Sequence, residues 1–368
     1  MKVLIISIDK GLLGRGQLGD ALERHKKYGD FCDKLDIIVM SKKGFDKYKI
    51  SDKVTAYPTN SSVKLKYIHD AYKIGKNLFK ENNYDLIITQ TPFVDGLVGW
   101  RLKSKFKSKL LVHFHGDFWD NIKWLQESGL NYFLLPLSKL VVKHADAVRV
   151  MSSGQKEKII KVGVSEKKVR VISTPIDLSK YLRISNEVNH RNILHIGRDD
   201  EVKDYNTLVK SFKLVKDKIS DVNFIQAGAD TDREIKKAMV KNNFSAIDIR
   251  GKIKHNELTD LYSQIDFLVL SSTSESFGKV LVESNASGKP VVSTATTGAK
   301  EIIEDGKNGF LVPIGDAEKL AEKIIWLLQN QEEAKKMGAY GRELAKERYS
   351  DNTNKIINFW TDIINNNL

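Results

Sequence analysis

Short apolar runs alternate with longer amphipathic stretches along the first half of the chain. The runs have the length of buried strands, and the stretches between them have the length of helices. Such alternation is typical of a parallel sheet with helices on both faces. The predicted strands of this half are Val3–Ile8, Leu35–Met40, Leu86–Thr89, Leu110–Phe114 and Ala147–Met151.

The pattern restarts after the polar stretch Ser173–Asn189. We therefore predict two doubly wound, Rossmann-like α/β domains, residues 1–180 and 181–350. Residues 351–368 predict a helix with an apolar side, which can cross back onto the first domain. The predicted strands of the second half are Asn192–Gly197, Val222–Ala227, Ile247–Arg250, Phe267–Leu270, Val291–Ser293 and Gly309–Val312.

Composition changes this picture little. No apolar run approaches the roughly 18 residues that span a bilayer. The apolar start is too short for a signal peptide and is better interpreted as a strand. The single cysteine, Cys32, fits a reducing, cytoplasmic compartment.

The charge is distributed unevenly. The net charge is +13, and residues 1–180 hold 33 Lys and Arg against 19 Asp and Glu, a net of +14. An excess confined to one half indicates an anionic partner, such as an anionic membrane surface or a phosphate-bearing acceptor, or else a solvated lysine-rich surface. We expect no nucleic acid, because no recognition module is visible and aromatic residues do not interleave with the basic run Arg101–Lys109.

The strongest chemical signal follows a predicted strand and opens a helix, at Ser271–Glu283. Glu275 in the loop and Glu283 in the helix would lie on the order of 12 Å apart along the axis. That spacing suits a bent nucleotide sugar, with one carboxylate near the sugar and the other near the ribose. The free amides at the helix start, around Phe277–Lys279, would face its phosphates.

Cations for those phosphates follow the first strand of the second half, in Gly197–Lys203. Arg198 and Lys203 could clamp a diphosphate. Fixed cations stabilise the negative charge that a departing diphosphate gains. They can replace a metal ion, so we expect no catalytic metal and no other cofactor.

These motifs resemble family 4 of the retaining glycosyltransferases, which have the two-domain GT-B fold with a cleft between the domains. The resemblance covers about 120 residues in family order. It differs at Thr297-Gly298, where the family usually has two glycines. The matching positions are Gly197-Arg198, Lys203, Ser272, Glu275, Phe277-Gly278, Glu283, Gly288, Pro290-Val291-Val292, Gly298, Glu301 and Asn308–Val312.

The resemblance implies roles for these residues. Arg198 and Lys203 would bind the diphosphate of the donor, Glu275 the donor sugar and Glu283 the ribose. Phe277, Gly278, Lys279 and Gly298 would line the donor site. It also implies transfer with retention of configuration.

The first half resembles the family less closely. Gly14 and Gly16 lie in a glycine-rich loop after the first strand, where the backbone could approach a substrate. By resemblance His115, at the end of a strand, would lie near the donor sugar. Asp117 could position His115 or bind the acceptor.

Two further segments allow a functional and a simpler interpretation. Asp230-Thr231-Asp232 spells a metal-binding motif of other glycosyltransferases, but its position favours a surface loop. The stretch Asn121–Lys139 could be an interfacial membrane element or a helix facing the core.

We therefore predict a metal-independent, retaining hexosyl- or related glycosyltransferase. Its donor would be a UDP- or GDP-linked sugar, and its acceptor a glycan or lipid-linked glycan of the cell envelope. It would be cytoplasmic, with peripheral association through the basic first domain. The alternatives are a nucleotide-sugar epimerase of similar architecture and an inactive subunit that binds a sugar nucleotide.

Overall fold

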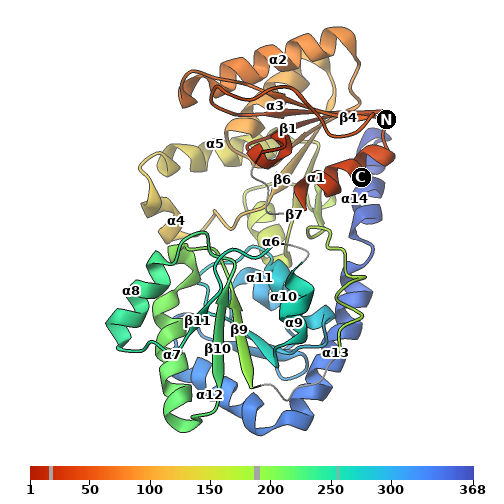
Figure 1. Cartoon of the computed structure of the whole chain (residues 1–368). Coiled ribbons are helices and arrows are strands. Elements are labelled where there is room, and N and C mark those ends of the chain that lie inside the picture. Colours follow the sequence, from red (N-terminus) through yellow and green to blue (C-terminus); the bar gives the residue numbers. More distant parts are fainter. Residues whose placement is uncertain (16–19, 186–190, 255–256) are drawn as a thin grey trace. The chain divides into compact units, whose positions relative to one another are not determined.

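Two parallel β-sheets organise the chain (Figure 1). The computed structural model describes residues 1–15, 20–185, 191–254 and 257–368. Met1–Ser173 together with Asn352–Leu368 form the first unit, and Thr174–Asp351 form the second. The chain thus leaves the first unit after Ser173, at the start of the polar stretch Ser173–Asn189 after which the sequence pattern restarts.

The first unit contains an eight-stranded sheet of order β3-β4-β2-β1-β5-β6-β7-β8. Neighbouring strands are parallel except β3 and β4, which are antiparallel. Its strands are β1 Lys2–Ser7, β2 Lys34–Val39, β3 Tyr48–Lys49, β4 Val54–Pro58, β5 Leu86–Thr89, β6 Lys109–Phe114, β7 Ala147–Val150 and β8 Val169–Val171.

Three of these strands lie where the sequence pattern predicted none. β3 has two exposed residues, and β4 ends at Pro58 and alternates buried with partly exposed positions. β8 has three residues and is preceded by two lysines. Each joins the sheet through its backbone, so none needs the continuous apolar run by which the central strands were recognised.

Helices cover both faces of this sheet (Figure 1). One face packs Leu4, Ile6 and Val112 against α2, α3 and α5. The other packs Val3, Ile5 and neighbouring residues against α1 and α14. The helices of the unit are α1 Ala21–Asp30, α2 Tyr67–Glu81, α3 Val94–Phe106, α4 Ile122–Glu127, α5 Asn131–His144, α6 Ser153–Lys161 and α14 Asn352–Ile364, with short 3₁₀ turns at Lys10–Leu13, Lys64–Lys66 and Glu166–Lys168.

The last helix, α14, returns to the first unit as the sequence predicted. Its apolar side is buried, and Trp360 meets Tyr28 of α1 edge to face at 5.3 Å. The Asn352 side chain donates to the Ser173 hydroxyl at 2.7 Å. The helix therefore belongs to the core of this unit.

The second unit contains a six-stranded parallel sheet of order β11-β10-β9-β12-β13-β14. Aromatic and aliphatic residues of α7, α8 and α12 fill one face. Its elements are β9 Asn192–Ile196, β10 Asn223–Ala227, β11 Asp248–Ile249, β12 Phe267–Leu270, β13 Val291–Thr294, β14 Gly309–Val312, the 3₁₀ turn Glu201–Lys203, α7 Tyr205–Lys218, α8 Arg233–Asn242, α9 Leu258–Ser263, α10 Lys279–Ala286, α11 Thr297–Ile302, α12 Ala317–Gln329 and α13 Gln331–Tyr349.

Each sheet has one point at which the strand order reverses. In the first unit β1 lies between β2 and β5, and in the second β9 lies between β10 and β12. Open parallel sheets bind their ligands at the carboxyl edge, at such a point of reversal. Across the residues that the structure describes, every helix is too short or too polar to cross a membrane.

Candidate functional site

The two strongest motifs of the sequence meet at the strand reversal of the second unit. Lys203 follows β9 and Glu275 follows β12, and these two strands are neighbours. The Lys203 ammonium group donates a hydrogen bond to Oε1 of Glu275. Both side chains are largely enclosed, with 16% and 18% of their surfaces exposed. A lysine–carboxylate pair at the carboxyl edge of an open parallel sheet lies where such sheets bind ligands.

The loops that carry the pair are fastened to each other by hydrogen bonds. The Ser271 hydroxyl donates to the carbonyl of Lys203 at 2.7 Å, and the Thr273 amide donates to the carbonyl of Val202 at 2.8 Å. The Ser272 hydroxyl donates to the same Glu275 oxygen that Lys203 contacts, at 3.0 Å. The geometry of the pair is therefore set by the surrounding backbone.

Arg198 precedes Lys203 in the same loop and is much more exposed than Lys203 or Glu275. Its side chain is 82% exposed, and its nearest acidic neighbour is Asp200 at 3.9 Å. Gly197 leaves room for the stem of Lys203, because a Cβ there would lie 3.1 Å from Cδ of Lys203. One cation is thus anchored and the other extends into solvent, where it can reach a ligand.

Gly298, in the first turn of α11, brings the start of that helix against the backbone of Glu275. Its amide donates to the Glu275 carbonyl at 2.7 Å, and a Cβ at Gly298 would lie 2.6 Å from the backbone N and O of Phe277. The Phe277 ring is buried and meets Tyr349 edge to face. Only glycine permits this approach, and Phe277 presents backbone rather than its ring on the side of Gly298.

Helix α10 begins beside this loop. Gly278 precedes it with a φ of +87°, and Lys279 is its first residue. Glu283 lies on the second turn and is buried, where Tyr262 donates to its Oε2 at 3.3 Å. Burial first, and then the Glu283 charge, raise the pKa of Tyr262 well above its ordinary value, so its hydroxyl keeps the proton that it donates.

His115 lies in the first unit, one residue beyond β6. Its Nε2 is 2.9 Å from Oε1 of Gln90, which directly follows the neighbouring strand β5. Burial, assisted by the positive charge of Arg149, lowers the pKa of His115 well below its ordinary value. The imidazole is therefore neutral at pH 7.

Two other predicted positions of the first unit, Gly14 and Asp117, contact residues of the same unit. Gly14 has a φ of +77°, and a Cβ there would lie 2.7 Å from the ring of Tyr48. Gly16 lies outside the described residues. Asp117 forms an ion pair with Lys158 at 2.7 Å, at a largely enclosed position.

The acidic tripeptide Asp230-Thr231-Asp232 is engaged in pairs with its surroundings. Asp230 meets Lys252 at 3.3 Å, and Asp232 meets Lys236 at 2.6 Å. The Thr231 hydroxyl donates to Asp199. The described part of the chain contains no group of three or more His, Cys, Asp or Glu placed to hold a metal ion.

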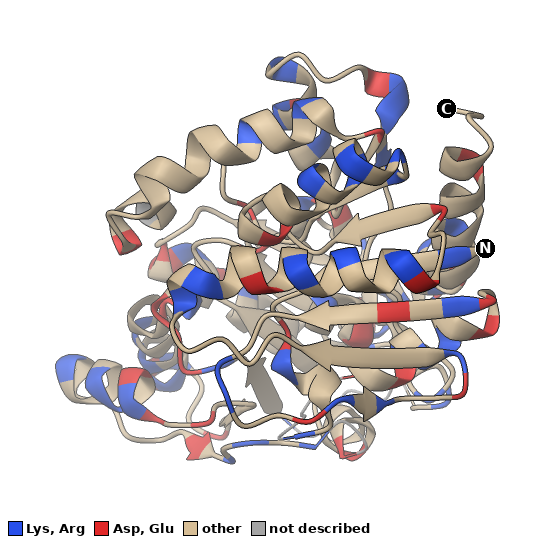
Figure 2. Ribbon diagram, turned by 90° about the horizontal axis from the view of Figure 1, so that it is seen from above, with Lys and Arg blue, Asp and Glu red and all other residues tan. Residues whose placement is uncertain are grey.

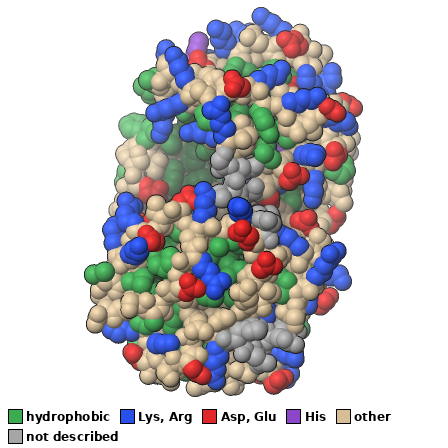
Figure 3. Space-filling view, in the orientation of Figure 1, with side chains coloured by type: hydrophobic (Ala, Val, Ile, Leu, Met, Phe, Trp, Pro, Cys, Tyr) green, Lys and Arg blue, Asp and Glu red, His purple; other side chains and the backbone are tan. Residues whose placement is uncertain are grey.

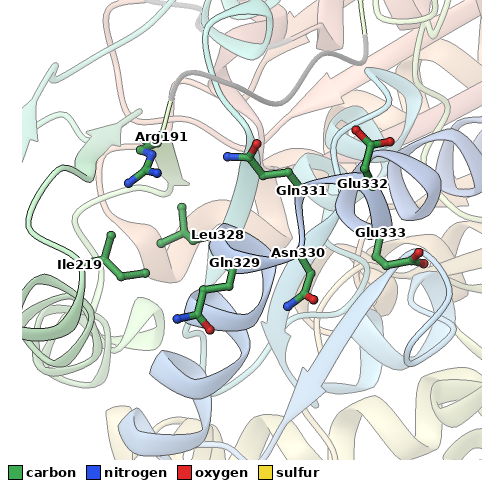
Figure 4. A pocket seen from close by; sticks show the side chains of 8 residues that line it. All are labelled: Arg191, Ile219, Leu328, Gln329, Asn330, Gln331, Glu332 and Glu333. Atoms are coloured by element: carbon green, nitrogen blue, oxygen red, sulfur yellow. The ribbon is translucent and has the colours of Figure 1, made fainter.

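A cavity of about 620 Å³ lies elsewhere in the second unit (Figure 4). Arg191, which precedes β9, lines it together with residues at the junction of α12 and α13. It therefore lies at the amino end of β9, whereas Lys203 follows the carboxyl end. None of the predicted site residues lines it.

The first unit carries an apolar surface on α4 and α5, which we call the α4–α5 surface. Ile122, Leu130, Tyr132, Phe133 and Leu140 are all exposed, with Phe133 at 76%. Figure 3 shows apolar side chains gathered over this part of the unit. Phe133 and Leu140 are seven residues apart, so they share the outer side of α5 while Val141 and Val142 face the core.

Lysine and arginine recur on the helices of the same unit (Figure 2). Three side chains of the basic run Arg101–Lys109 interact with residues of the same unit. Lys103 bonds Asp146 at 2.9 Å, Arg101 lies 4.8 Å over the ring of Tyr72, and Lys109 donates to Asn366. Lys143 is exposed one turn beyond Leu140.

Sequence reasoning missed the groups that support the predicted residues. Gln90 could have been found, because it is polar and directly follows a buried strand next to that of His115. Tyr262, the donor to Glu283, carries no such signal, because it lies on a separate helix 21 residues away in sequence.

Comparisons with known proteins identify the family and the fold. Residues 34–180 match the family model described as Glycosyltransferase Family 4, and residues 181–344 match that of Glycosyl transferases group 1. An uncharacterised glycosyltransferase of Methanocaldococcus jannaschii is 32% identical over 285 residues, which cover 77% of this chain and 76% of that protein. The capsular polysaccharide biosynthesis glycosyltransferase CapM of Staphylococcus aureus is 27% identical, over 60% of this chain and 63% of its own.

Two solved structures share the fold over nearly the whole chain. Sucrose-phosphate synthase from Thermosynechococcus elongatus superposes with a TM-score of 0.83 at 20% identity and covers 100% of both chains. Anabaena HepE, in complex with UDP and glucose, has a TM-score of 0.78 at 19% identity and covers 98% of this chain and all of its own. The fold is GT-B, and the chain belongs to the group 1, family 4 glycosyltransferases.

Proposed function

We propose that this transferase moves a sugar from a nucleoside-diphosphate sugar to a glycan or lipid-linked glycan of the cell envelope, with retention of configuration and without a metal ion. The observation that carries the proposal is the enclosed Lys203–Glu275 pair, held between the β9 and β12 loops with exposed Arg198 beside it. The site offers two cations and a carboxylate within two adjoining loops. This combination suits a diphosphate attached to a sugar, because the cations match the phosphates and the carboxylate can accept hydrogen bonds from sugar hydroxyls.

The charge of each side chain determines which part of the donor it binds. Arg198 and Lys203 bind the diphosphate and stabilise the charge that it gains as the bond to the sugar breaks. Glu275 accepts hydrogen bonds from sugar hydroxyls, and Glu283 accepts them from the ribose. The first unit, with His115 and Asp117, contacts the sugar and the acceptor, whose hydroxyl passes its proton to the leaving phosphate.

Removal of Lys203 tests the assignment. Lys203→Ala should lower turnover by at least about a hundredfold, because one developing charge loses its fixed partner. Lys210→Ala is the matched control, since Lys210 lies on the following helix, α7, and forms an exposed pair with Glu318 of α12. Equal activity of the two variants would show that Lys203 has no role in transfer.

A chelator tests metal independence. Transfer by protein treated with EDTA should continue at the same rate, because Arg198 and Lys203 carry the charge that a metal would carry. Loss of activity that Mg²⁺ or Mn²⁺ restores would contradict the proposal. The same assay should include analysis of the donor, since a changed sugar without an acceptor would indicate an epimerase.

The donor and acceptor classes follow from the names of similar proteins. HepE was crystallised with UDP and glucose, so UDP-glucose is the first donor to test and GDP-linked sugars come next. CapM acts in capsular polysaccharide biosynthesis, which supports an envelope glycan as the acceptor class. Thermal-shift measurements with a panel of nucleotide sugars would rank the donors.

We further propose that the first unit associates with the inner face of an anionic membrane. The exposed apolar residues of the α4–α5 surface would enter the headgroup region, and surrounding lysines would meet lipid phosphates. Flotation with phosphatidylcholine vesicles, with and without phosphatidylglycerol, tests this. Phe133→Ser should reduce the bound fraction severalfold, whereas Leu65→Ser, an exposed apolar position elsewhere in the unit, should not. Equal losses would contradict a specific role for this surface.

A further inference from the structure

Three buried side chains form a hydrogen-bonded chain directly beneath Gly197 and Arg198. Nδ1 of His195 lies 2.6 Å from Oε1 of Gln226. Nε2 of Gln226 donates to the Gly197 carbonyl at 3.2 Å and to the Tyr205 hydroxyl at 3.1 Å. The Tyr205 hydroxyl in turn donates to the Arg198 carbonyl at 2.9 Å and also lies 3.3 Å from that of Gly197.

The direction of each bond in this chain is determined. Both hydrogens of the Gln226 amide are used, so its oxygen accepts and Nδ1 of His195 carries the proton. The Tyr205 hydroxyl accepts from Gln226 and gives its own proton to a backbone carbonyl. Burial lowers the pKa of His195 to about 4, so the ring is neutral at pH 7.

These hydrogen-bonded side chains fix the orientation of two peptide groups. The carbonyls of Gly197 and Arg198 both point to the Tyr205 hydroxyl, on the buried side. In a trans peptide the N–H points opposite to the C=O. The amides of Arg198 and Asp199 therefore point away from the core, and neither donates to an acceptor within the part of the chain that the structure describes.

The Asp199 side chain fixes the other end of the segment Gly197–Asp199. The Asp199 carboxylate accepts from the Glu234 amide at 2.8 Å and from the Arg233 amide at 3.2 Å, at the start of α8. The backbone from Gly197 to Asp199 is thus held on its carbonyl side by Gln226 and Tyr205 and at its end by α8. Consecutive amides that face the same way form a concave site for an anion.

We propose that the amides of Arg198 and Asp199 bind the donor diphosphate, and that His195, Gln226 and Tyr205 are positioning residues that hold these amides toward it. This inference rests on the proposed function, because it supplies the same diphosphate with two further hydrogen-bond donors. Without the chain, either peptide could turn its carbonyl outward, and a carbonyl oxygen repels a phosphate. Hydrogen bonds from amides to a charged acceptor are stronger than neutral ones.

Tyr205→Phe tests the inference with the smallest change of shape. Calorimetry with UDP and GDP should show roughly tenfold weaker binding, the size expected for loss of one hydrogen bond to a charged group. Ser211→Ala is the matched control, because Ser211 is a buried hydroxyl on the same helix that donates to the Leu208 carbonyl at 2.7 Å. The KM for the donor should rise more than kcat falls.

Nuclear magnetic resonance of the unsubstituted protein gives a readout that a merely structural role would not move. With ¹⁵N-arginine labelling, the Arg198 amide signal, assigned by its absence in Arg198→Lys, should move strongly downfield when UDP or GDP is added. An unmoved signal would overturn the proposal even if Tyr205→Phe failed to fold. Gln226→Met should weaken nucleotide binding as Tyr205→Phe does.

These experiments distinguish an error in the proposed function from an error in the role of His195, Gln226 and Tyr205. If unsubstituted protein bound neither UDP nor GDP, the proposed function itself would be wrong. If it bound one of them, and Lys203→Ala lost binding while Tyr205→Phe bound normally with an unmoved Arg198 signal, only the role of the buried chain would be wrong.

Discussion

At the scale of single residues, the site of the second unit depends on a close approach of two backbone segments. Gly298→Ala would place a methyl group 2.6 Å from the backbone of Phe277. Either the start of α11 or the loop of Phe277 must then move, so we expect a loss of about 1–3 kcal/mol in stability. Nucleotide binding should also weaken, because Glu275 lies in the same loop as Phe277. Thermal unfolding and calorimetry with UDP measure the two effects.

Gly129→Ala is the control for this substitution, since a Cβ there meets no atom within 4 Å. It should leave both quantities unchanged. If Gly298→Ala lowered stability but not nucleotide affinity, the loop would support the fold without shaping the donor site.

Asp95 illustrates a second residue-scale effect, the titration of a buried carboxyl group. Burial raises its pKa to about 6, an effect that hydrogen bonds from Thr91 only partly offset. The folded state then binds a proton that the unfolded state releases near pH 4. Stability from this group is therefore present below pH 4 and decreases as pH rises toward 6.

Asp95→Asn removes this titration and keeps the shape of the side chain. The stability difference between the original protein and the variant should fall by on the order of 2–3 kcal/mol from pH 4 to pH 6 and stay constant above. Urea unfolding at several pH values measures it. A flat difference for Asp95→Asn would mean that the pKa of Asp95 is the same in the folded and the unfolded state.

At the scale of elements, α14 is distant in sequence from the sheet that it covers. Trp360 is fully buried among residues of β1, β2 and α1. Trp360→Ala should cost about 3–5 kcal/mol, because a large side chain leaves a cavity in a packed core. The loss should fall on the first unit alone.

Hydrogen exchange resolves this loss by element. In Trp360→Ala the amides of β1 and β6 should exchange faster, while those of β9 and β12 should not change. Asn358→Ala, on the exposed side of the same helix, should change neither. Faster exchange in both sheets would show that the units unfold together.

The elements also show which parts of the fold could be predicted from the sequence. Continuous apolar runs predicted the central strands of both sheets, and a one-sided apolar pattern predicted α14, because burial imposes those patterns directly. The strands β3 and β8 at the edges of the sheet, and β4 beside β3, were missed because positions at or next to an edge tolerate polar residues. The loops of Arg198, Lys203 and Glu275 were recognised as motifs. The hydrogen bond between Gln226 and Tyr205 could not be predicted from the sequence, because it joins residues 21 positions apart that carry no shared pattern.

At the scale of the whole molecule, the two units differ in the number of imidazoles whose pKa the fold lowers. His25, His113 and His115 lie in the first unit and His195 in the second. Burial lowers the pKa of His25 and of His195 to about 4, and those of His113 and His115 well below the ordinary value. Each ring is neutral when folded and takes up a proton near pH 6.5 when unfolded.

The sign of the effect follows from proton uptake by the unfolded state. Stability from these groups is complete above pH 6.5 and is lost as pH falls toward their folded pKa values. Each group contributes up to about 1.4 kcal/mol per pH unit in that range. Asp95 acts in the opposite direction but is a single group. Acidification from pH 7 to pH 5 should therefore destabilise the first unit more than the second.

Urea unfolding at each pH, followed by a pulse of hydrogen exchange at one fixed pH, separates the units. Peptides from β1 and β6 should lose protection at lower urea as pH falls, and those from β9 and β12 should shift less. The tryptophans give an independent check, because Trp326 belongs to the second unit and the other four to the first. In a Trp326→Phe background, fluorescence reports the first unit alone. A first unit that kept its stability from pH 7 to pH 5 would mean that its imidazoles acquire protons in the folded state, with partners that their neutral packing does not provide.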